Sequence, residues 1–209
     1  MSNVFLFGTS GHAKVVLDIV QLMQKFRVKY MLDDDERLHE QEFLGVRTIG
    51  GQNFLGDDRL SGMKGLVSIG DNTNRKAIFE LMQSSGHEFF NAIHPQTTIA
   101  ASTQLGTGIV VTAGVVINPG AVIGDNTILN TSSTVDHDCR IGSHVHIAPG
   151  CNVCGHVQIG DGALIGAGST IVPSVKVGEG AVVGAGATVT QDVAAGQTVI
   201  GTPARTINK

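Results

Sequence analysis

The sequence predicts two folds in one chain: a small α/β domain followed by a parallel β-helix built from six-residue units. From Ile99 onward an aliphatic residue recurs every six residues. Before Ile99, short apolar runs alternate with amphipathic stretches. The charge also changes there, because the residues before Ile99 hold 10 of the 14 Lys and Arg and 12 of the 18 Asp and Glu. We therefore expect domains at 1–92 and 93–196, followed by a C-terminal tail at 197–209.

The repeat runs without insertion to Ala194, and all sixteen units open on Ile, Leu or Val, from Ile99 to Val189. A fixed short period of this kind is typical of a stacked β-coil, in which each unit gives one short strand and one corner. Three units close a triangular coil of about 18 residues with the aliphatic side chains inside. Residues 18 apart are therefore expected to lie one above the other.

Two further positions of the unit are restricted. The second position is Gly in seven units, which predicts a corner conformation that residues with a Cβ avoid. The fifth position is small or β-branched in nearly all units and is expected to point inward. Cys139 and Cys151 occupy fifth positions, so we expect buried free thiols in a reducing cytoplasm rather than a disulfide framework.

Bulk properties exclude several partners. The net charge of −4 and the lack of a basic run argue against nucleic-acid binding. The first residues show no basic n-region and no cleavage-like site, so we expect no signal peptide. No apolar run approaches the roughly 20 residues of a membrane span. We therefore expect a cytoplasmic protein without membrane insertion.

The first domain reads as alternating strands and helices. The expected elements are strands at 4–7, 29–32 and 66–70 and helices at 13–24 and 73–84. This alternation predicts a small parallel, Rossmann-like sheet. Ligands of such sheets bind at the carboxyl ends of the strands, where Gly8, Gly11, Asp33 and Asp34 fall.

These residues predict a nucleotide site. Backbone N–H groups at the start of a helix favour phosphate. Asp33 lies 22 residues after Gly11, near where a dinucleotide fold catches a ribose hydroxyl. The dinucleotide fingerprint has glycine where Ser10 stands, so only half of that pattern is present. The alternative is a tight turn followed by a solvated acidic loop.

Five segments together carry a family resemblance: Gly8-Thr-Ser-Gly-His-Ala-Lys, Leu32-Asp-Asp-Asp, Val135-Asp-His-Asp-Cys, His144-Val-His-Ile-Ala-Pro-Gly and Gly201-Thr-Pro-Ala-Arg. Over essentially its whole length the chain resembles the hexapeptide-repeat sugar O- and N-acyltransferases. That family includes sialic-acid O-acetyltransferases and nucleotide-linked amino-sugar N-acetyltransferases. The resemblance implies a left-handed β-helix, a homotrimer, acetyl-CoA as donor and an active site between neighbouring prisms. It also implies that the first domain holds the nucleotide of a UDP-, GDP- or dTDP-linked sugar, with Gly8, Ser10, Gly11, His12, Asp33 and Asp34 as substrate-binding residues.

His137 is the candidate general base. It is the third residue of its unit and should point outward, between Pro119 and Gly155 one coil away on either side. Histidine, with an ordinary pKa of about 6.5, suits proton removal near neutrality. By resemblance, His137 is the base and Asp138 its partner. His156 lies one coil from Asp138 and could compete for the same carboxylate, and the sequence leaves that choice open.

The resemblance also implies the acetyl-CoA contacts. His146 matches a family position that contacts acetyl-CoA, and its expected neighbours, Ile128 and Leu164, would suit the pantetheine arm. The remaining candidates for binding acetyl-CoA are Gly155, Ala167, Ala185 and Arg205. Asn130 is a candidate for hydrogen bonding to the sugar or to the loop.

The expected function is acetyl-CoA-dependent N-acetylation of a nucleotide-linked amino sugar, a 4-amino-4,6-dideoxyhexose, in lipopolysaccharide, O-antigen or other surface-glycan synthesis. The alternative is O-acetylation of sialic acid or a related sugar, which would use the same base. A zinc hydratase of this fold would need a His-x4-His pair, and none is present, so no metal is expected. A structural scaffold is a further alternative, although the outward positions are mixed rather than regular ladders.

Overall fold

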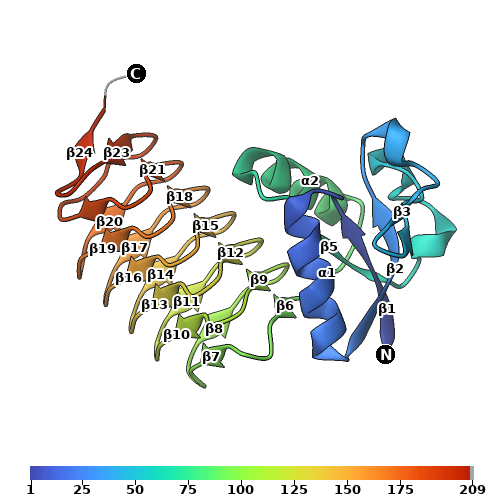
Figure 1. The fold of residues 1–209 in the computed structure, drawn as a ribbon, viewed down its shortest axis with the longest axis horizontal. Helices are drawn as coiled ribbons and strands as arrows, with labels where there is room; N and C mark the ends of the chain where they lie inside the picture. The colour runs from blue at the N-terminus through green and yellow to red at the C-terminus, as the bar shows by residue number, and fades with distance from the viewer. Residues whose placement is uncertain (208–209) are drawn as a thin grey trace. The chain divides into compact units, whose positions relative to one another are not determined.

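The computed structural model describes residues 1–207, and the chain divides into two compact units after Pro95. Figure 1 follows the chain from an α/β unit into a stack of short strands. The fold class predicted from the sequence is confirmed, because a small parallel sheet with two helices precedes a parallel β-solenoid. Among the described residues, neither helix combines the length and apolar character that a bilayer span requires.

The sheet of the first unit has three parallel strands. β1 (Ser2–Phe7) lies between β2 (Phe26–Leu32) and β5 (Lys64–Val67). The third strand ends at Val67, earlier than expected, although the backbone N–H of Ser68 still donates to the carbonyl oxygen of Phe7. The hydroxyl of Ser68 donates to the carbonyl oxygens of Phe7 and Gly8. The residues after β1 and β5 are therefore held side by side.

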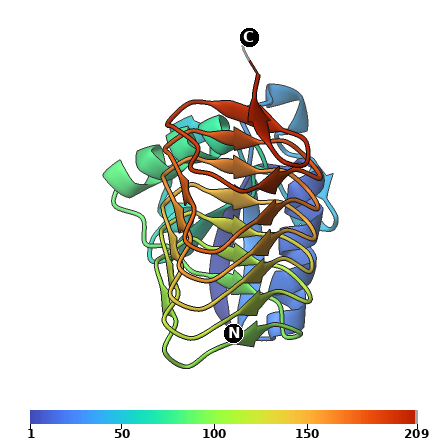
Figure 2. The same cartoon turned by 90° about the vertical axis from the view of Figure 1, so that its left-hand side faces the viewer.

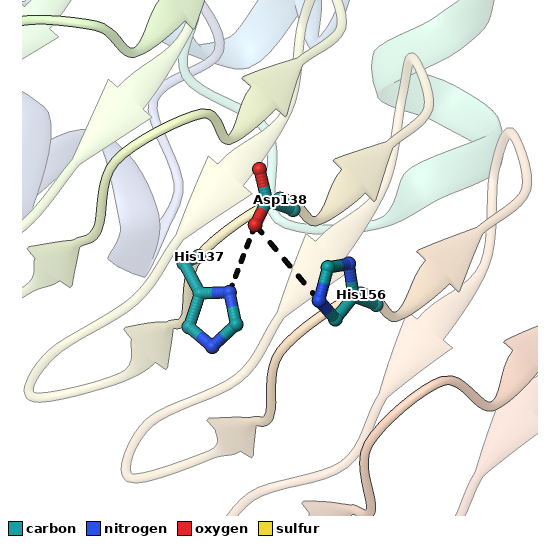
Figure 3. A group of neighbouring side chains, drawn as sticks. All are labelled: His137, Asp138 and His156. Atoms are coloured by element: carbon teal, nitrogen blue, oxygen red, sulfur yellow. Dashed lines mark hydrogen bonds and ion pairs between the residues drawn. The ribbon is translucent and has the colours of Figure 1, made fainter.

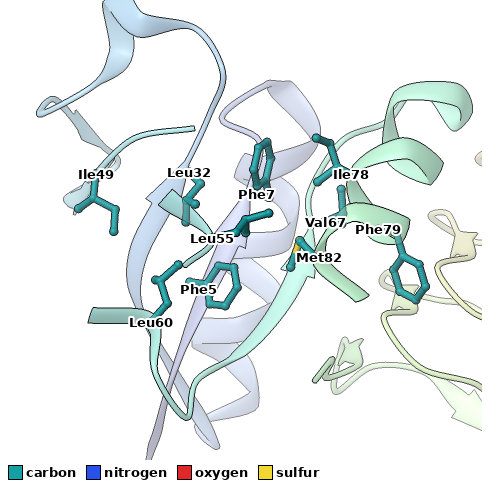
Figure 4. Packing of buried hydrophobic residues seen from close by; sticks show 10 residues of the cluster. All are labelled: Phe5, Phe7, Leu32, Ile49, Leu55, Leu60, Val67, Ile78, Phe79 and Met82. Atoms are coloured by element: carbon teal, nitrogen blue, oxygen red, sulfur yellow. The ribbon is translucent and has the colours of Figure 1, made fainter. Parts of the chain in front are cut away.

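Helices α1 (Gly11–Met23) and α2 (Asn72–Ser84) pack against this sheet. Phe5 and Phe7 of β1 are buried in a cluster that includes Ile78, Phe79 and Met82 of α2 (Figure 4). Because side chains alternate along a strand, the buried Val4 and Leu6 point to the opposite face. The central strand is thus apolar on both faces, as a covered parallel strand requires. The smaller elements of this unit are η1 (Glu36–Leu38), β3 (Glu42–Phe43), β4 (Val46–Arg47), η2 (Gln52–Phe54), η3 (Asp58–Leu60) and β6 (Ala92–Ile93).

The second unit is a three-sided prism. Each strand from β7 to β22 has two residues and ends on one of the sixteen repeated aliphatic residues. The strands are β7 (Thr98–Ile99), β8 (Gln104–Leu105), β9 (Val110–Val111), β10 (Val116–Ile117), β11 (Val122–Ile123), β12 (Ile128–Leu129), β13 (Thr134–Val135), β14 (Arg140–Ile141), β15 (His146–Ile147), β16 (Asn152–Val153), β17 (Gln158–Ile159), β18 (Leu164–Ile165), β19 (Thr170–Ile171), β20 (Lys176–Val177), β21 (Val182–Val183) and β22 (Thr188–Val189). Strands of one face lie one above the next (Figure 2).

Each face pairs residues 18 apart in parallel, so Ile117 lies beside Val135 and Val135 beside Val153. One face runs from β7 to β22 through every third strand, and a second runs from β8 to β20. The third runs from β9 to β21 and continues into the tail. There β23 (Thr198–Ile200) pairs with β21 and, in antiparallel sense, with β24 (Arg205–Thr206).

The inward fifth positions are buried as expected, except for the half-buried Thr103. Cys139 and Cys151 are buried free thiols. Burial raises the pKa of Cys139 to about 11 and also raises the pKa of Cys151. Burial thus disfavours the reactive thiolate form of both residues.

The expected reason for the second-position glycines was wrong. The left-handed backbone falls at the fourth position, where all fourteen residues from Gly108 to Gly186 have positive φ. The second-position glycines instead allow close stacking of coils. A Cβ on Gly124 would lie 2.6 Å from the carbonyl carbon of Gly142, in the next coil. Six of the fourteen left-handed residues are not glycine, and they include Asp138 and His156.

Candidate functional site

His137 stands at the corner between β13 and β14. The aliphatic Val135 anchors the unit inside the coil, and the chain then turns outward. The imidazole points away from the interior, with 50% of its side chain exposed. Its backbone oxygen accepts from the N–H of His156, 3.0 Å away, which fixes the stacking of the two corners. The repeat therefore presents this histidine on a rigid support.

Asp138 is within hydrogen-bond distance of His137. The carboxylate oxygen Oδ2 is 2.9 Å from Nδ1 of His137 and 3.9 Å from Nε2 of His156 (Figure 3). The pairing that the sequence left open therefore favours His137. Asp138 has φ of 58°, an unusual conformation for a residue with a side chain.

Asp136 supports the backbone rather than the ring. Its Oδ1 accepts from the backbone N–H of His137 and from Nδ2 of Asn118, each at 2.8 Å. These hydrogen bonds lower the pKa of Asp136. Asn118 was not singled out from the sequence, although the 18-residue spacing places it one coil from Asp136. Its amide and the carboxylate together hold the corner that carries the imidazole.

The charge around His137 suits a base that is protonated reversibly. The hydrogen bond that Nδ1–H donates to Asp138 raises the pKa of His137. Desolvation lowers this pKa by less, and the negative charges of Asp136 and Asp138 raise it further. When Nδ1–H donates to Asp138, the lone pair of the neutral ring lies on Nε2. The carboxylate thus assigns the proton-accepting role to Nε2.

Gly155 provides the space in which this ring lies. A Cβ on the buried Gly155 would be 2.7 Å from Nε2 of His137 and 2.8 Å from its Cε1. Alanine occupies the same unit position at 167 and 185, so the corner backbone itself accepts a methyl group. The requirement for glycine at 155 therefore comes from the imidazole.

A second group of candidates lies on another face. His146 belongs to β15, is half-buried, and pairs in register with Ile128 and Leu164 as the repeat predicts. Its Nε2 is 3.2 Å from Nδ2 of Asn130, whose Oδ1 accepts from the N–H of Thr131. Asn130 therefore orients the His146 ring, a contact that the sequence analysis did not foresee.

The residues expected to bind acetyl-CoA do not all lie along one face or corner of the prism. Gly155 stacks beside His137. Ala167 and Ala185 are exposed and stacked at the corner that follows β18 and β21. Arg205 is exposed in β24, on the face that also holds His146. The candidates thus form two groups, one around His137 and one along the face of β15.

The first unit holds a cavity of about 490 Å³ at the carboxyl ends of its strands. Gly8, Ser10, Asp33 and Asp34, four of the predicted substrate-binding residues, line it. Gly11 and His12 form the first residues of α1 and are not among its lining residues. The other lining residues are Phe7, Thr9, Gln52, Ile69, Asn74, Ala77 and Ile78.

The acidic residues shape this cavity. Oδ2 of Asp33 accepts from the backbone N–H and the hydroxyl of Thr9, at 2.8 and 2.6 Å. Oδ1 of Asp34 accepts from the N–H of Gln52 at 2.8 Å. Gly8 has φ of 109°, and a Cβ there would lie 2.7 Å from Cγ1 of Ile69. The loop after β1 is therefore fixed by both its backbone and its acidic partner.

A buried arginine that the sequence analysis missed secures the loop after β5. Arg75 donates from Nη1 to the carbonyl oxygen of Gly70 at 3.1 Å and from Nη2 to Oδ1 of Asn72 at 2.8 Å. Burial lowers the pKa of Arg75 to about 10. Arg75 lies in the first turns of α2. Arginine side chains are mostly exposed in folded proteins, so the sequence alone would predict a solvent-exposed residue here.

Comparisons with known proteins agree with this architecture. The model of the PglD N-terminal domain matches residues 3–82. The bacterial transferase hexapeptide model matches residues 120–155 and 156–191, and the hexapeptide repeat of succinyl-transferase matches residues 96–119. GDP-perosamine N-acetyltransferase of Escherichia coli O157:H7 is 36% identical over 164 residues, which cover 77% of this chain and 74% of that protein.

Two solved structures are similar over nearly the whole chain. PerB from Caulobacter crescentus, in complex with CoA and GDP-perosamine, is 35% identical with a TM-score of 0.92 and covers 100% of this chain and 98% of that one. The acetyltransferase domain of PglB from Neisseria gonorrhoeae FA1090, in complex with acetyl coenzyme A, is 33% identical with a TM-score of 0.91 and 98% coverage of both chains. The chain belongs to the hexapeptide-repeat sugar acyltransferase family, and within it to the acetyltransferases.

Proposed function

We propose that this enzyme transfers the acetyl group of acetyl-CoA to the amino group of a nucleotide-linked amino sugar, a 4-amino-4,6-dideoxyhexose, as a step of surface-glycan synthesis. The observation that carries the proposal is the His137–Asp138 pair, with its 2.9 Å contact at an exposed corner. The similarity to N-acetyltransferases crystallised with CoA and GDP-perosamine supports the donor and the substrate class.

In the proposed reaction His137 moves one proton. Nε2 accepts a proton from the sugar amine as the amine nitrogen attacks the thioester carbonyl carbon. The C–S bond then breaks, and the imidazolium returns the proton to the departing sulfur of CoA. The products are the amide and the free thiol. Asp138 keeps the ring in the required tautomer and stabilises the imidazolium while the proton is on it.

We assign the acetyl-CoA side of the site to the face of β15. His146, oriented by Asn130, is the donor proposed to face the carbonyl oxygen on which negative charge develops. The exposed Ala167 and Ala185 leave room for an extended pantetheine arm, and Arg205 offers its guanidinium to the phosphates.

We propose that two copies of the chain complete each site within a homotrimer. The His137 group and the His146 group lie on different sides of one prism, so a neighbouring copy would supply the second group. Co-assembling chains that carry His137→Ala with chains that carry His146→Ala tests this. Activity above that of either homogeneous variant is expected, because a mixed interface restores one intact site. Activity no higher than the variants, in assemblies shown to be mixed, contradicts shared sites.

The nucleotide is proposed to bind in the 490 Å³ cavity of the first unit. The N-terminus of α1 adjoins it, and this helix has no acidic residue in its first turn and no side-chain N-cap bond. Its backbone N–H groups therefore remain suited to a diphosphate.

A product assay with acetyl-CoA and a panel of UDP-, GDP- and dTDP-linked amino sugars tests the function. Turnover is expected on at least one 4-amino sugar. Turnover on free sialic acid alone, with no binding of UDP, GDP or dTDP by calorimetry, would instead support O-acetylation.

A further inference from the structure

Three metal-ligating side chains converge at the corner of His137. His137, Asp138 and His156 each offer one ligand atom, and these atoms all lie within 4.8 Å of one another. Figure 3 shows both imidazole rings directed at the same carboxylate oxygen. The rings meet edge to face with centroids 5.0 Å apart. All three side chains are at least half exposed, so an ion can reach them from solvent.

The prism holds these residues in position. His137 and Asp138 are the third and fourth residues of one unit, and His156 is the fourth residue of the unit one coil further on. The backbone hydrogen bond between His156 and His137 fixes their stacking. Both fourth-position residues have left-handed φ, 58° for Asp138 and 61° for His156, where glycine is the commoner solution in this chain. The repeat itself therefore brings the three side chains together, without any change in the backbone.

The spacing suits a small divalent ion. Tetrahedral zinc with bonds of about 2.0–2.1 Å separates its ligand atoms by about 3.4 Å. The separations between the Asp138 oxygen and the two ring nitrogens, 2.9 and 3.9 Å, lie on either side of that value. Two imidazoles and a carboxylate are ligands that Zn²⁺ prefers, and three protein ligands leave one coordination position open.

We propose that His137, Asp138 and His156 form a binding site for Zn²⁺ and that its occupancy stops acetyl transfer. The inhibitory half of this inference rests on the proposed role of His137. An ion on Nδ1 takes the place of the proton that Nδ1 otherwise carries and donates to Asp138 in a hydrogen bond. The neutral ring then carries its proton on Nε2, so the nitrogen proposed to act as base has no lone pair. When zinc binds to a neutral ring, the proton moves from Nδ1 to Nε2 and none is released. When zinc binds to an imidazolium, the proton on Nδ1 is released to solvent. Zinc bound at this corner is therefore an inhibitor.

Calorimetric titration with Zn²⁺ alone, in a non-chelating buffer, tests the binding. Wild-type protein is compared with His156→Gln and with His144→Gln, a matched control because His144 is also a fourth-position residue with left-handed φ. Loss of one ligand is expected to weaken binding by at least about tenfold in His156→Gln. The control should bind as the wild type does. Equal affinity of wild type and His156→Gln, or an equal loss in the control, overturns the site.

A second measurement tests the inhibition. The acetylated sugar is quantified directly, because the thiol of CoA itself binds zinc. Each rate is divided by the rate of the same variant in chelator, and inhibition is expected at lower free Zn²⁺ for wild type than for His156→Gln. Zinc bound at this site without loss of rate contradicts the inhibitory half. Absence of turnover in chelator would contradict the proposed function instead, and the calorimetry would still decide whether the site exists.

Discussion

The two units of this chain hold their candidate functional residues in opposite ways. In the α/β unit, the residues that line the cavity also hold the fold, since Asp33 secures the loop of Thr9 and Gly8 fits only without a side chain. In the prism, the fold depends on inward aliphatic residues and a repeated backbone ladder, while His137 and Asp138 project from a corner. The difference implies that chemistry and stability are separable in the prism and coupled in the α/β unit.

Removing the proposed base should give the largest effect on rate with little effect on stability. In His137→Ala we expect kcat/KM for acetyl transfer to fall by a factor of about 10²–10⁴. The denaturation midpoint should stay near that of wild type, because half of the His137 side chain is exposed. Product formation and chemical unfolding on the same preparation check this. A fall in stability that parallels the fall in rate would show that the corner is not separable from the fold.

Truncating an inward residue should do the reverse. Ile147 is fully buried in the prism, next in sequence to His146. Ile147→Ala is expected to lower the free energy of unfolding by about 2–5 kcal/mol, through lost burial and a cavity. Denaturant titration measures it. If the change costs less than the exposed His137→Ala, the assignment of stability to the aliphatic column is wrong.

Adding a methyl group at Gly155 probes the contact between backbone and base. The new Cβ would lie 2.7 Å from Nε2 of His137 and would displace the ring. A displacement of about 1 Å can reduce the rate by about 10²-fold, and we expect Gly155→Ala to lower kcat at nearly unchanged stability. Ala113→Gly, a change of the same size at the same unit position and outside the proposed site, is the control. A rate equal to that of wild type in Gly155→Ala would remove the proposed packing of His137.

In the α/β unit the corresponding change should affect both properties together. Gly8→Ala places a side chain at φ of 109° and against Ile69. We expect a loss of about 1–3 kcal/mol of stability from the strained backbone, accompanied by weaker binding of the nucleotide sugar. Unfolding and calorimetry with the nucleotide measure the two effects. A change in affinity with no change in stability would contradict the coupling.

The sequence predicted most of the prism, but it predicted the conformation of the corners only in part. A strict six-residue period determines which residues point inward and which lie 18 apart, so the outward position of His137 over Gly155 follows from counting. The left-handed fourth position also left a signal, since it holds only Gly, Asn, Ser, Asp or His from 108 to 186. Our interpretation assigned that conformation to the second position instead, where glycine reflects coil-to-coil contact.

Side-chain partners were harder to predict because they depend on rotamers rather than on period. Spacing placed His156 one coil from Asp138 but could not give the 2.9 and 3.9 Å that distinguish the two histidines. It also gave no sign that Asn130 contacts His146 across sixteen residues. In the α/β unit no repeat exists, and the burial of Arg75 depends on how the loop after β5 folds back.

The pH dependence of kcat/KM in wild type and Asp138→Asn tests the central claim most directly. Only the neutral imidazole accepts a proton, and Asp138 raises the pKa of His137. The rate of the wild type should therefore rise with pH through a value above the ordinary 6.5. Asparagine no longer stabilises the imidazolium, so the rise should move to lower pH, while ionisation of the substrate amine is common to both proteins. An identical pH profile in the two proteins would contradict a base held by Asp138.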